Sequence, residues 1–231
     1  MNTAPREHKT EDGKCILAIM AKAPREGHVK TRLASVGSPA FVLDLYRAFI
    51  EDSIELGERA GAGVVIVCPS DDTDEITAWV PSTIRVVTQP GRGLADALAA
   101  TFEILCATSD RVVAFNGDSP HLSPAVLDAA FAAIGNHDVV VGPCDDGGYF
   151  LVGAKKAHPG LFAPSALGTG AALESLLAQA GRLGLSWHLT TSHYDVDVPA
   201  DVARLAAELS VTPGLAPRTA KALSGWAPVG T

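Results

Sequence analysis

Short apolar runs recur along the chain and are separated by longer amphipathic segments. Several of these runs, such as 64–67 and 139–141, consist of valine and isoleucine with no polar alternation. Uninterrupted apolar runs are typical of strands that are covered on both faces of a sheet. We therefore predict strands at residues 15–21, 63–68, 84–88, 111–116, 138–142, 148–153 and 186–189.

Between these runs, apolar residues recur with the spacing of a helix. Apolar side chains keep to one helical face through 41–49 and again through 94–106. Residues 71–75 supply N-cap candidates and acidic side chains for the start of a short helix. Ser123 and the proline that follows it predict the start of a helix over 125–134.

The order of these elements predicts an α/β fold. Strand–helix alternation over this length implies three layers with right-handed crossovers. The runs at 138–142 and 148–153 are too close for a crossover helix, so we expect an antiparallel pair and a mixed sheet. We expect one domain over 14–210, between a flexible polar leader at 1–13 and a proline-containing surface extension at 211–231 without clear periodicity.

Composition narrows the classes of partner. The formal net charge of -8 and the lack of a Lys/Arg run argue against nucleic acid, and no apolar stretch is long enough for a membrane span. The first ten residues lack the apolar segment of a signal peptide. The four cysteines include no C-x-x-C pair, so neither zinc nor a disulfide framework is indicated. We expect a cytoplasmic, reduced protein with Trp187 in its core.

A basic loop follows the first predicted strand. It runs from Lys22 to Leu33 as KAPREGHVKTRL, on a chain that is acidic as a whole. Open α/β sheets bind ligands beyond the carboxyl ends of their strands. Lys22, Lys30 and Arg32 would neutralise phosphate oxygens, and Gly27 would shape the turn. A solvated basic turn is the alternative explanation.

Carboxylates follow two other apolar segments. Asp118 comes directly after the run 111–116, and Asp197 precedes a predicted helix. Mg²⁺ and Mn²⁺ prefer carboxylates together with phosphates and waters, so both residues are candidate metal ligands. A turn cap at Asp118 explains the pattern equally well. Alternation puts Asp195 on the same side as Asp197; we expect Asp195 to fix the loop and Asp201 to favour the helix dipole.

The segment 145–153 predicts a hairpin, because its Asp-Gly pair is a turn signal. Its glycines would also let a substrate pack against the backbone, with Asp146 or Tyr149 contacting polar groups of that substrate. The turn alone explains the segment without any binding role. His121, beside the candidate metal site, is another side chain that could contact a substrate.

Four of these segments, in this order, resemble a bacterial family of GT-A-type transferases of unknown function that is often labelled glycosyltransferase A. They are KAPREGHVKTRL at 22–33, GDSP at 117–120, DGGYFLVG at 146–153 and DVDVPAD at 195–201. The family is similar to the phospholactate guanylyltransferases and, more distantly, to the molybdopterin-cofactor nucleotidyltransferases. The likeness runs from about residue 16 to about residue 209. It implies a three-layer nucleotide-diphospho-sugar transferase fold (GT-A, Rossmann-like) with a mixed sheet.

The resemblance also implies roles for single residues. It implies nucleotide binding by Lys22, Gly27, Lys30, Thr31, Arg32, Gln89 and Gly93, with the segment 89–94 near the base or ribose. It implies an acceptor pocket lined by Asp146, Gly147, Gly148 and Tyr149. It implies a Mg²⁺ or Mn²⁺ ion held by Asp118 and Asp197, which together with Lys30 and Arg32 form the catalytic set.

Two departures from the family pattern are present. Leu-Gly-Thr at 167–169 replaces the usual Trp-Ser/Thr pair, which bears on the identity of the acceptor. Asp-Ser-Pro at 118–120 replaces Asp-Cys-Pro, which leaves the candidate metal ligand in place.

Two chemistries suit such a fold. We favour transfer of a nucleotidyl group from a nucleoside triphosphate to a small phosphate- or phosphonate-bearing acceptor, with release of pyrophosphate. The alternatives are a glycosyltransferase that uses a nucleotide-sugar donor and an inactive nucleotide-binding module. The expected partners are the nucleotide and a small-molecule acceptor, without nucleic acid or membrane, and a homodimer is left open.

Overall fold

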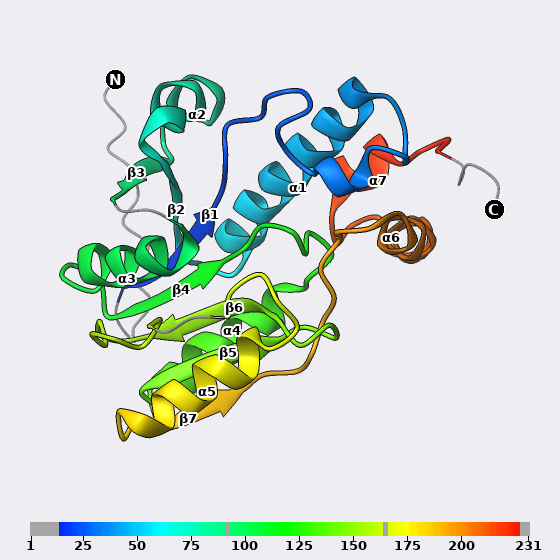
Figure 1. Cartoon of the computed structure of the whole chain (residues 1–231). Coiled ribbons are helices and arrows are strands. Elements are labelled where there is room, and N and C mark those ends of the chain that lie inside the picture. The colour runs from blue at the N-terminus through cyan, green and yellow to red at the C-terminus, as the bar shows by residue number, and fades with distance from the viewer. Residues whose placement is uncertain (1–13, 91–92, 164–165, 227–231) are drawn as a thin grey trace.

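The computed structural model describes residues 14–90, 93–163 and 166–226, and within these the strands form a single mixed sheet (Figure 1). Every predicted strand is present, with each end within one residue of its predicted position. The strands are β1 (Cys15–Met20), β2 (Gly63–Pro69), β3 (Arg85–Gln89), β4 (Arg111–Phe115), β5 (Val139–Pro143), β6 (Tyr149–Ala154) and β7 (Trp187–Leu189).

The spatial order of the strands is β3-β2-β1-β4-β6-β5-β7. β1 runs parallel to both β2 and β4, and β2 runs parallel to β3. β6 is antiparallel to its neighbours β4 and β5, as the short connection between the two runs predicts, and β7 is parallel to β5. The carboxyl ends of β1 and β4 therefore lie side by side, which places the loops after them together.

Helices cover both faces of this sheet, so the predicted three layers are confirmed (Figure 1). α1, α2 and α4 pack on one face through a core that includes Ile50, Ile76 and Leu127, whereas α3 and α5 pack on the other through Phe102 and Leu176. The bounds are α1 (Pro39–Arg59), α2 (Thr73–Trp79), α3 (Leu94–Leu105), α4 (Pro124–Ile134), α5 (Ala172–Arg182), α6 (Pro199–Val211) and α7 (Pro217–Ala222), with short 3₁₀ turns η1 (Thr31–Leu33) and η2 (Ser70–Asp72). Among the described helices, none is both long and apolar enough to cross a membrane.

The helix starts differ in how they are capped. Ser38 caps α1 by accepting the N–H of Phe41 at 3.1 Å. Ser123 stands at the N-cap of α4, as predicted, but its side chain makes no capping bond. Asp72 also makes no capping bond at the start of α2. Its carboxylate instead binds the loop after β1, which is described below.

The segment after 210 differs from its sequence prediction. It contains the short helix α7, which contributes to a third apolar cluster together with α1 and α6. Asp52 of α1 accepts the N–H groups of Arg218 and Thr219 at 3.1 and 2.8 Å. A helix this short has no readable periodicity, and the residue that caps it comes from a distant part of the chain.

Trp187 is not in the core, contrary to expectation. It lies on β7, the outermost strand of the described sheet, and 42% of the residue is exposed. Because β7 has a neighbouring strand on one side only, no further described strand covers the other side of this residue.

Candidate functional site

The loop after β1 turns at Lys30. This residue has φ 47° and ψ 41°, and it is the only non-glycine with a positive φ in the part of the chain that the structure describes. The left-handed conformation is uncommon for a lysine. It lets the loop turn directly into η1, while the lysine side chain runs inward and is only 8% exposed.

Asp118 lies just past the end of β4, on a bend that requires glycine. Gly117 has φ +74°, and a Cβ at this position would lie 2.8 Å from Cδ1 of Ile50. The glycine therefore lets the bend pack closely against α1. The N–H of Asp118 donates to Oδ1 of Asn116 at 3.0 Å, which holds the carboxylate at the end of the strand.

The segment before α6 is fastened beside this bend. The N–H of Val196 donates to the carbonyl of Asp118 at 2.9 Å. The buried hydroxyl of Ser119 donates to the carbonyl of Tyr194 at 3.0 Å and to Oδ1 of Asp195 at 2.9 Å. Asp195 therefore helps to fix the loop, as the sequence predicts.

Asp201 secures the other side of the same segment. Its Oδ2 accepts the N–H groups of Asp197 and Val198 at 3.0 and 2.8 Å, at the start of α6. The residue thus stabilises the helix start and orients the backbone at Asp197, which agrees with its predicted place at the N-terminus of the helix.

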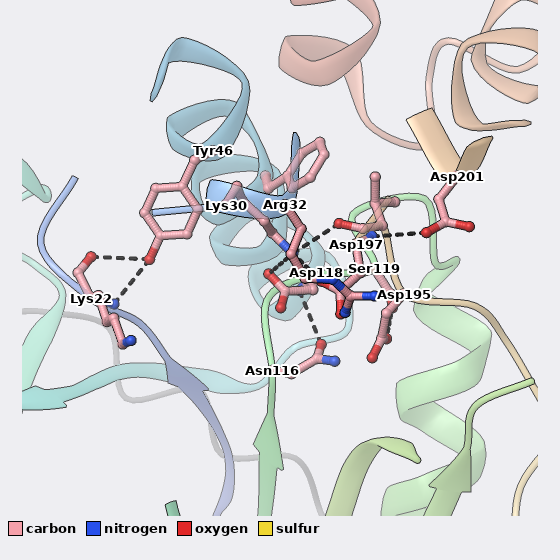
Figure 2. Close-up of polar contacts among 12 residues, drawn as sticks. Lys22, Lys30, Arg32, Tyr46, Asn116, Asp118, Ser119, Asp195, Asp197 and Asp201 are labelled. Carbon is pink, nitrogen blue, oxygen red and sulfur yellow. Dashed lines mark hydrogen bonds and ion pairs between the residues drawn. The ribbon is translucent and has the colours of Figure 1, made fainter. Parts of the chain in front are cut away.

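The ammonium group of Lys30 joins the basic loop to the bend at Asp118 and to the segment before α6 (Figure 2). Nζ of Lys30 lies 2.8 Å from Oδ1 of Asp118 and 2.9 Å from Oδ1 of Asp197, and it donates to the carbonyl of Val196 at 2.9 Å. Nη1 of Arg32 lies 3.3 Å from Oδ2 of Asp197. We call Lys30, Arg32, Asp118 and Asp197 the junction cluster. It brings the full predicted catalytic set together in space.

The charged groups of the junction cluster shift one another's pKa values. Burial acts to lower the pKa of Lys30, but the carboxylates of Asp118 and Asp197 outweigh it, so the pKa is raised and the ammonium is retained. Burial raises the pKa of Asp118; Lys30 opposes this change, and the carboxylates of Asp195 and Asp197 add to it. Perturbed charges of this kind are more frequent at functional sites than elsewhere in proteins.

A first cavity, of about 680 Å³, opens beside the junction cluster. This volume is typical of small-molecule sites. The lining includes every residue that the resemblance assigns to the nucleotide except Gly27, namely Lys22, Lys30, Thr31, Arg32, Gln89 and Gly93. Of the segment 89–94, Gly91 and Arg92 lie outside the described residues.

A second cavity, of about 540 Å³, also borders the cluster. Its lining includes Asp146, Gly148 and Tyr149, which the resemblance assigns to the acceptor. Both cavities are lined by Met20, Arg32, Leu94, Asn116, Asp118 and Asp197, so they meet at the junction cluster.

Two predicted site glycines do not line either cavity. Gly27 has φ +73° and open space where a Cβ would be, so it shapes the turn of the basic loop. Gly147 has φ +87°, and a Cβ there would overlap the carbonyl oxygen of Gly170. The close approach at Gly147 is therefore to the chain's own backbone, because the hairpin loop packs on the segment before α5.

Two supports of the basic loop were not predicted. The hydroxyl of Tyr46 accepts the N–H of Lys22 at 2.9 Å and donates to its carbonyl at 3.0 Å (Figure 2). Asp72 accepts the N–H of Ala23 at 3.0 Å and pairs with Nη1 of Arg25 at 2.6 Å. Tyr46 falls on the apolar face of α1, and Asp72 stands at a helix N-cap position. The local sequence pattern therefore explains both residues without any contact to the basic loop.

His121 lies behind the site, outside the lining of both cavities. It is 4% exposed, its ring stacks on Tyr194 with centroids 4.2 Å apart, and neither ring nitrogen has a hydrogen-bond partner among the described residues. Burial lowers the pKa of His121 to about 4, so the ring is neutral. The guanidinium of Arg204 covers the Tyr194 ring at 3.7 Å from its centroid.

The donor set at the junction suits a hard divalent cation that is shared with a ligand. Within the described residues, no group of three or more His, Cys, Asp or Glu side chains is placed to hold a metal by itself. Asp118 and Asp197 offer two carboxylates that already share one positive charge, that of Lys30. Two carboxylates completed by phosphate oxygens and waters are the usual environment of Mg²⁺ beside a nucleotide.

Residues 54–169 match the model of the family described as uncharacterized proteins conserved in bacteria (DUF2064). This chain belongs to that family. The DUF2064 match spans β2 to β6 and so includes Asp118 and the hairpin that carries Asp146. No curated protein matches the chain.

Solved structures show the same fold. A crystal structure from Desulfovibrio desulfuricans G20, provisionally assigned as a nucleotide-diphospho-sugar transferase, is 24% identical, with a TM-score of 0.79 over 92% of this chain and 97% of that chain. A CMP:2-keto-3-deoxy-manno-octonic acid synthetase complexed with CTP is 13% identical, with a TM-score of 0.56 over 86% and 99% of the two chains. Rv0371c of Mycobacterium tuberculosis H37Rv, in a complex with manganese, is 18% identical, with a TM-score of 0.53 over 83% and 97%. The predicted nucleotide-diphospho-sugar transferase fold is thus confirmed.

Proposed function

We propose that this DUF2064 protein is a metal-dependent transferase that moves a nucleotidyl group from a nucleoside triphosphate to a small acceptor. The observation that carries the proposal is the meeting of two cavities at the junction cluster. Such an arrangement suits a reaction between two bound molecules, because their reacting atoms would meet where the fixed charges are concentrated.

The first cavity is proposed to hold the nucleotide. Lys22, Lys30 and Arg32 line it, and these side chains would neutralise the phosphate oxygens of a triphosphate. Gln89 and Gly93 line the same cavity and are proposed to contact the ribose or base. The CTP complex of the structurally similar synthetase supports a nucleoside triphosphate as the first ligand to test.

The reaction would be a direct displacement. An oxygen of the acceptor, taken in the sequence-based proposal as a phosphate or phosphonate oxygen, attacks the α-phosphorus. The bond from that phosphorus to the bridging oxygen breaks, and pyrophosphate leaves with the electron pair. Lys30 and Arg32 would orient the phosphates and offset the negative charge that develops, so no covalent enzyme intermediate is needed.

Asp118 and Asp197 are the residues that would hold Mg²⁺ or Mn²⁺. When bound, the metal would supply charge neutralisation at the phosphates. The manganese complex of Rv0371c supports testing Mn²⁺ alongside Mg²⁺. With Asp118 and Asp197 engaged by a metal, the ammonium of Lys30 would be free to turn towards the phosphates.

A glycosyltransferase is the second candidate. Asp146 lines the second cavity beside the junction and could serve as the base that removes a proton from an acceptor hydroxyl. The high TM-score with the Desulfovibrio protein, provisionally assigned as a nucleotide-diphospho-sugar transferase, supports keeping this alternative. In that reaction the acceptor oxygen would attack the anomeric carbon, and the nucleoside diphosphate would leave.

A thermal-shift panel separates these possibilities. The full-length protein is melted with Mg²⁺ or Mn²⁺ in the presence of CTP, the other nucleoside triphosphates, or nucleotide sugars. Ligands that bind only the folded state raise the melting temperature. Stabilisation by a triphosphate supports nucleotidyl transfer and identifies the base, whereas stabilisation by nucleotide sugars alone favours the second candidate. No shift with any of these ligands contradicts both candidates.

A further inference from the structure

The two cavities carry opposite charge. The first is lined by the cations Lys22, Lys30 and Arg32 against the carboxylates Asp118 and Asp197. The second is lined by Arg32 alone among lysines and arginines, against four carboxylates. These four are Asp118, Asp146, Asp195 and Asp197. A ligand that suits one cavity therefore does not suit the other.

The excess of negative charge in the second cavity comes from Asp146 and Asp195. The other two carboxylates are paired with Lys30 or Arg32 in the junction cluster, but neither Asp146 nor Asp195 forms an ion pair with a described lysine or arginine. Oδ1 of Asp146 accepts the N–H of Gly148 at 2.9 Å, and Oδ1 of Asp195 accepts the Ser119 hydroxyl. These bonds fix the orientation of both carboxylates without neutralising them.

The rest of the lining indicates the shape of the ligand. Tyr149 stands in the cavity wall, and its hydroxyl has no hydrogen-bond partner among the described residues. Burial raises the pKa of Tyr149, so this hydroxyl keeps its proton. The side chains of Leu98 and Leu167 line the same cavity and give it an apolar side. Leu167 belongs to the segment where the sequence departs from the Trp-Ser/Thr pair that the family resemblance implies.

We propose that the second cavity binds an acceptor whose non-reacting part is an apolar body with a hydrogen-bond-donating group, an ammonium or a hydroxyl, directed at Asp146 and Asp195. This inference rests on the proposed function, because it assumes that the acceptor occupies this cavity. A negatively charged group at that end of the acceptor would face two unpaired carboxylates. Arg32 is the only described lysine or arginine in this lining and lies at the junction, so an anionic reacting group would find a cation only there.

Three probes with one apolar body test the class of ligand. Benzylamine, benzyl alcohol and benzylphosphonate are titrated into the full-length protein, and binding is followed by saturation-transfer NMR. The variant is Asp146→Asn, which retains an oxygen to accept the Gly148 N–H but removes the charge. The matched control is Asp145→Asn, because the neighbouring carboxylate is bound to Ser192 at 2.8 Å and Arg204 at 3.4 Å and does not line the cavity.

We expect benzylamine to lose about three- to fivefold in affinity in Asp146→Asn, as for one partly exposed charge pair, and to be unaffected in Asp145→Asn. Benzyl alcohol should bind and be less sensitive to the change, which separates recognition of a hydroxyl from recognition of an ammonium. Benzylphosphonate should lose no affinity in either variant, because its anion would lie at the junction beside Arg32 rather than beside Asp146. The inference is overturned by an absence of benzylamine binding at millimolar concentration, by equal effects of the two variants, or by a benzylphosphonate affinity that falls with Asp146→Asn.

The result is separable from the proposed function. Nucleotide stabilisation in the thermal-shift panel reports on the first cavity, whereas these probes report on the second. Nucleotide stabilisation without the benzylamine result removes only the acceptor class. The benzylamine result without nucleotide stabilisation removes the nucleotide transferase and leaves the ligand class of the second cavity in place.

Discussion

The junction cluster and the contacts of Arg218 between α1 and α7 both join basic side chains to several carboxylates, and they differ in what surrounds them. In the junction cluster, Lys30 bridges Asp118 and Asp197 between two cavities. Between α1 and α7, Arg218 contacts Asp52 at 3.4 Å and Glu55 at 2.5 Å. The residue types are alike in both places.

The two clusters differ in whether their carboxylate oxygens are still free to accept a bond from a ligand. The Asp52 side chain is fully buried, and both of its oxygens are taken by N–H groups of α7. The Asp118 side chain is 28% exposed and borders both cavities. A carboxylate whose oxygens are all bound by the chain itself is structural, whereas one that faces a cavity is available to a ligand. The predictions below test this distinction, from the largest expected effect to the smallest.

The substitution Asp118→Asn should have the largest effect on function. We expect a loss of about 100-fold or more in metal-dependent turnover, because a charged candidate metal ligand becomes a neutral amide. Folding should change little, since Lys30 keeps its contacts with Asp197 and Val196. Turnover with the nucleotide chosen by the thermal-shift panel, together with urea unfolding, measures both quantities. Unchanged metal-dependent turnover would remove Asp118 from the site.

The substitution Asp52→Asn should have the opposite profile. An amide nitrogen would replace one of the oxygens that accept the α7 N–H groups, so we expect a loss of about 3 kcal/mol in the free energy of unfolding. Urea unfolding checks the loss. The rise in melting temperature that a nucleotide causes should be retained, and its disappearance would show that the two clusters are not independent.

Acid should destabilise the region behind the junction through His121. The folded protein holds this histidine neutral down to a pKa of about 4, whereas the unfolded chain takes up the proton near the ordinary value of 6.5. Stability is therefore intact above about pH 6.5 and is lost as the pH falls towards 4, by up to about 3 kcal/mol. Unfolding free energies across this pH range measure the effect in the wild type and in His121→Phe, which keeps an aromatic ring against Tyr194.

The His121→Phe variant should show a flatter dependence on pH than the wild type, and Asp52→Asn should not share this change. Equal curves for wild type and His121→Phe would assign the acid sensitivity to other groups.

The substitution Lys30→Ala should weaken nucleotide binding about tenfold, as expected for the loss of one charge-assisted contact to phosphate. Calorimetric titration with the stabilising nucleotide measures the change. Lys155→Ala removes an exposed lysine that lines neither cavity and serves as the control. An affinity that is the same in both variants would contradict the role of Lys30 at phosphate.

Much of the fold could be predicted because its signals are local. Short runs rich in apolar residues located the strands of the described sheet, and the short gap between β5 and β6 indicated their antiparallel pairing. Trp187 was placed wrongly because apolar character alone does not reveal that β7 lies at the edge of the sheet. Helix α7 was missed because its capping residue, Asp52, lies in a different element.

The site was predictable in its residues but not in its contacts. The basic loop and the strand-end carboxylates marked the junction cluster, since polar residues after buried strands stand out in a sequence. The bridge from Lys30 to Asp118 and Asp197 depends on the left-handed turn at Lys30, which has no sequence signal comparable to glycine. The roles of Tyr46 and Asp72 depend on contacts between residues far apart in the chain.

The contact of Asp52 of α1 with the N–H groups of α7, called the clasp below, also sets an order of assembly. Asp52 and Thr219 are 167 positions apart, so during synthesis the carboxylate leaves the ribosome long before its partner exists. Every described strand, and both cavity walls that the strands support, precede α7 in the chain. Because segments emerge in chain order, the nascent sheet can pair while α1 still carries a hydrated carboxylate on its outer side. The junction can therefore be built before this clasp closes, once the residues up to the end of α6 have left the ribosome and while α7 is still inside the exit tunnel.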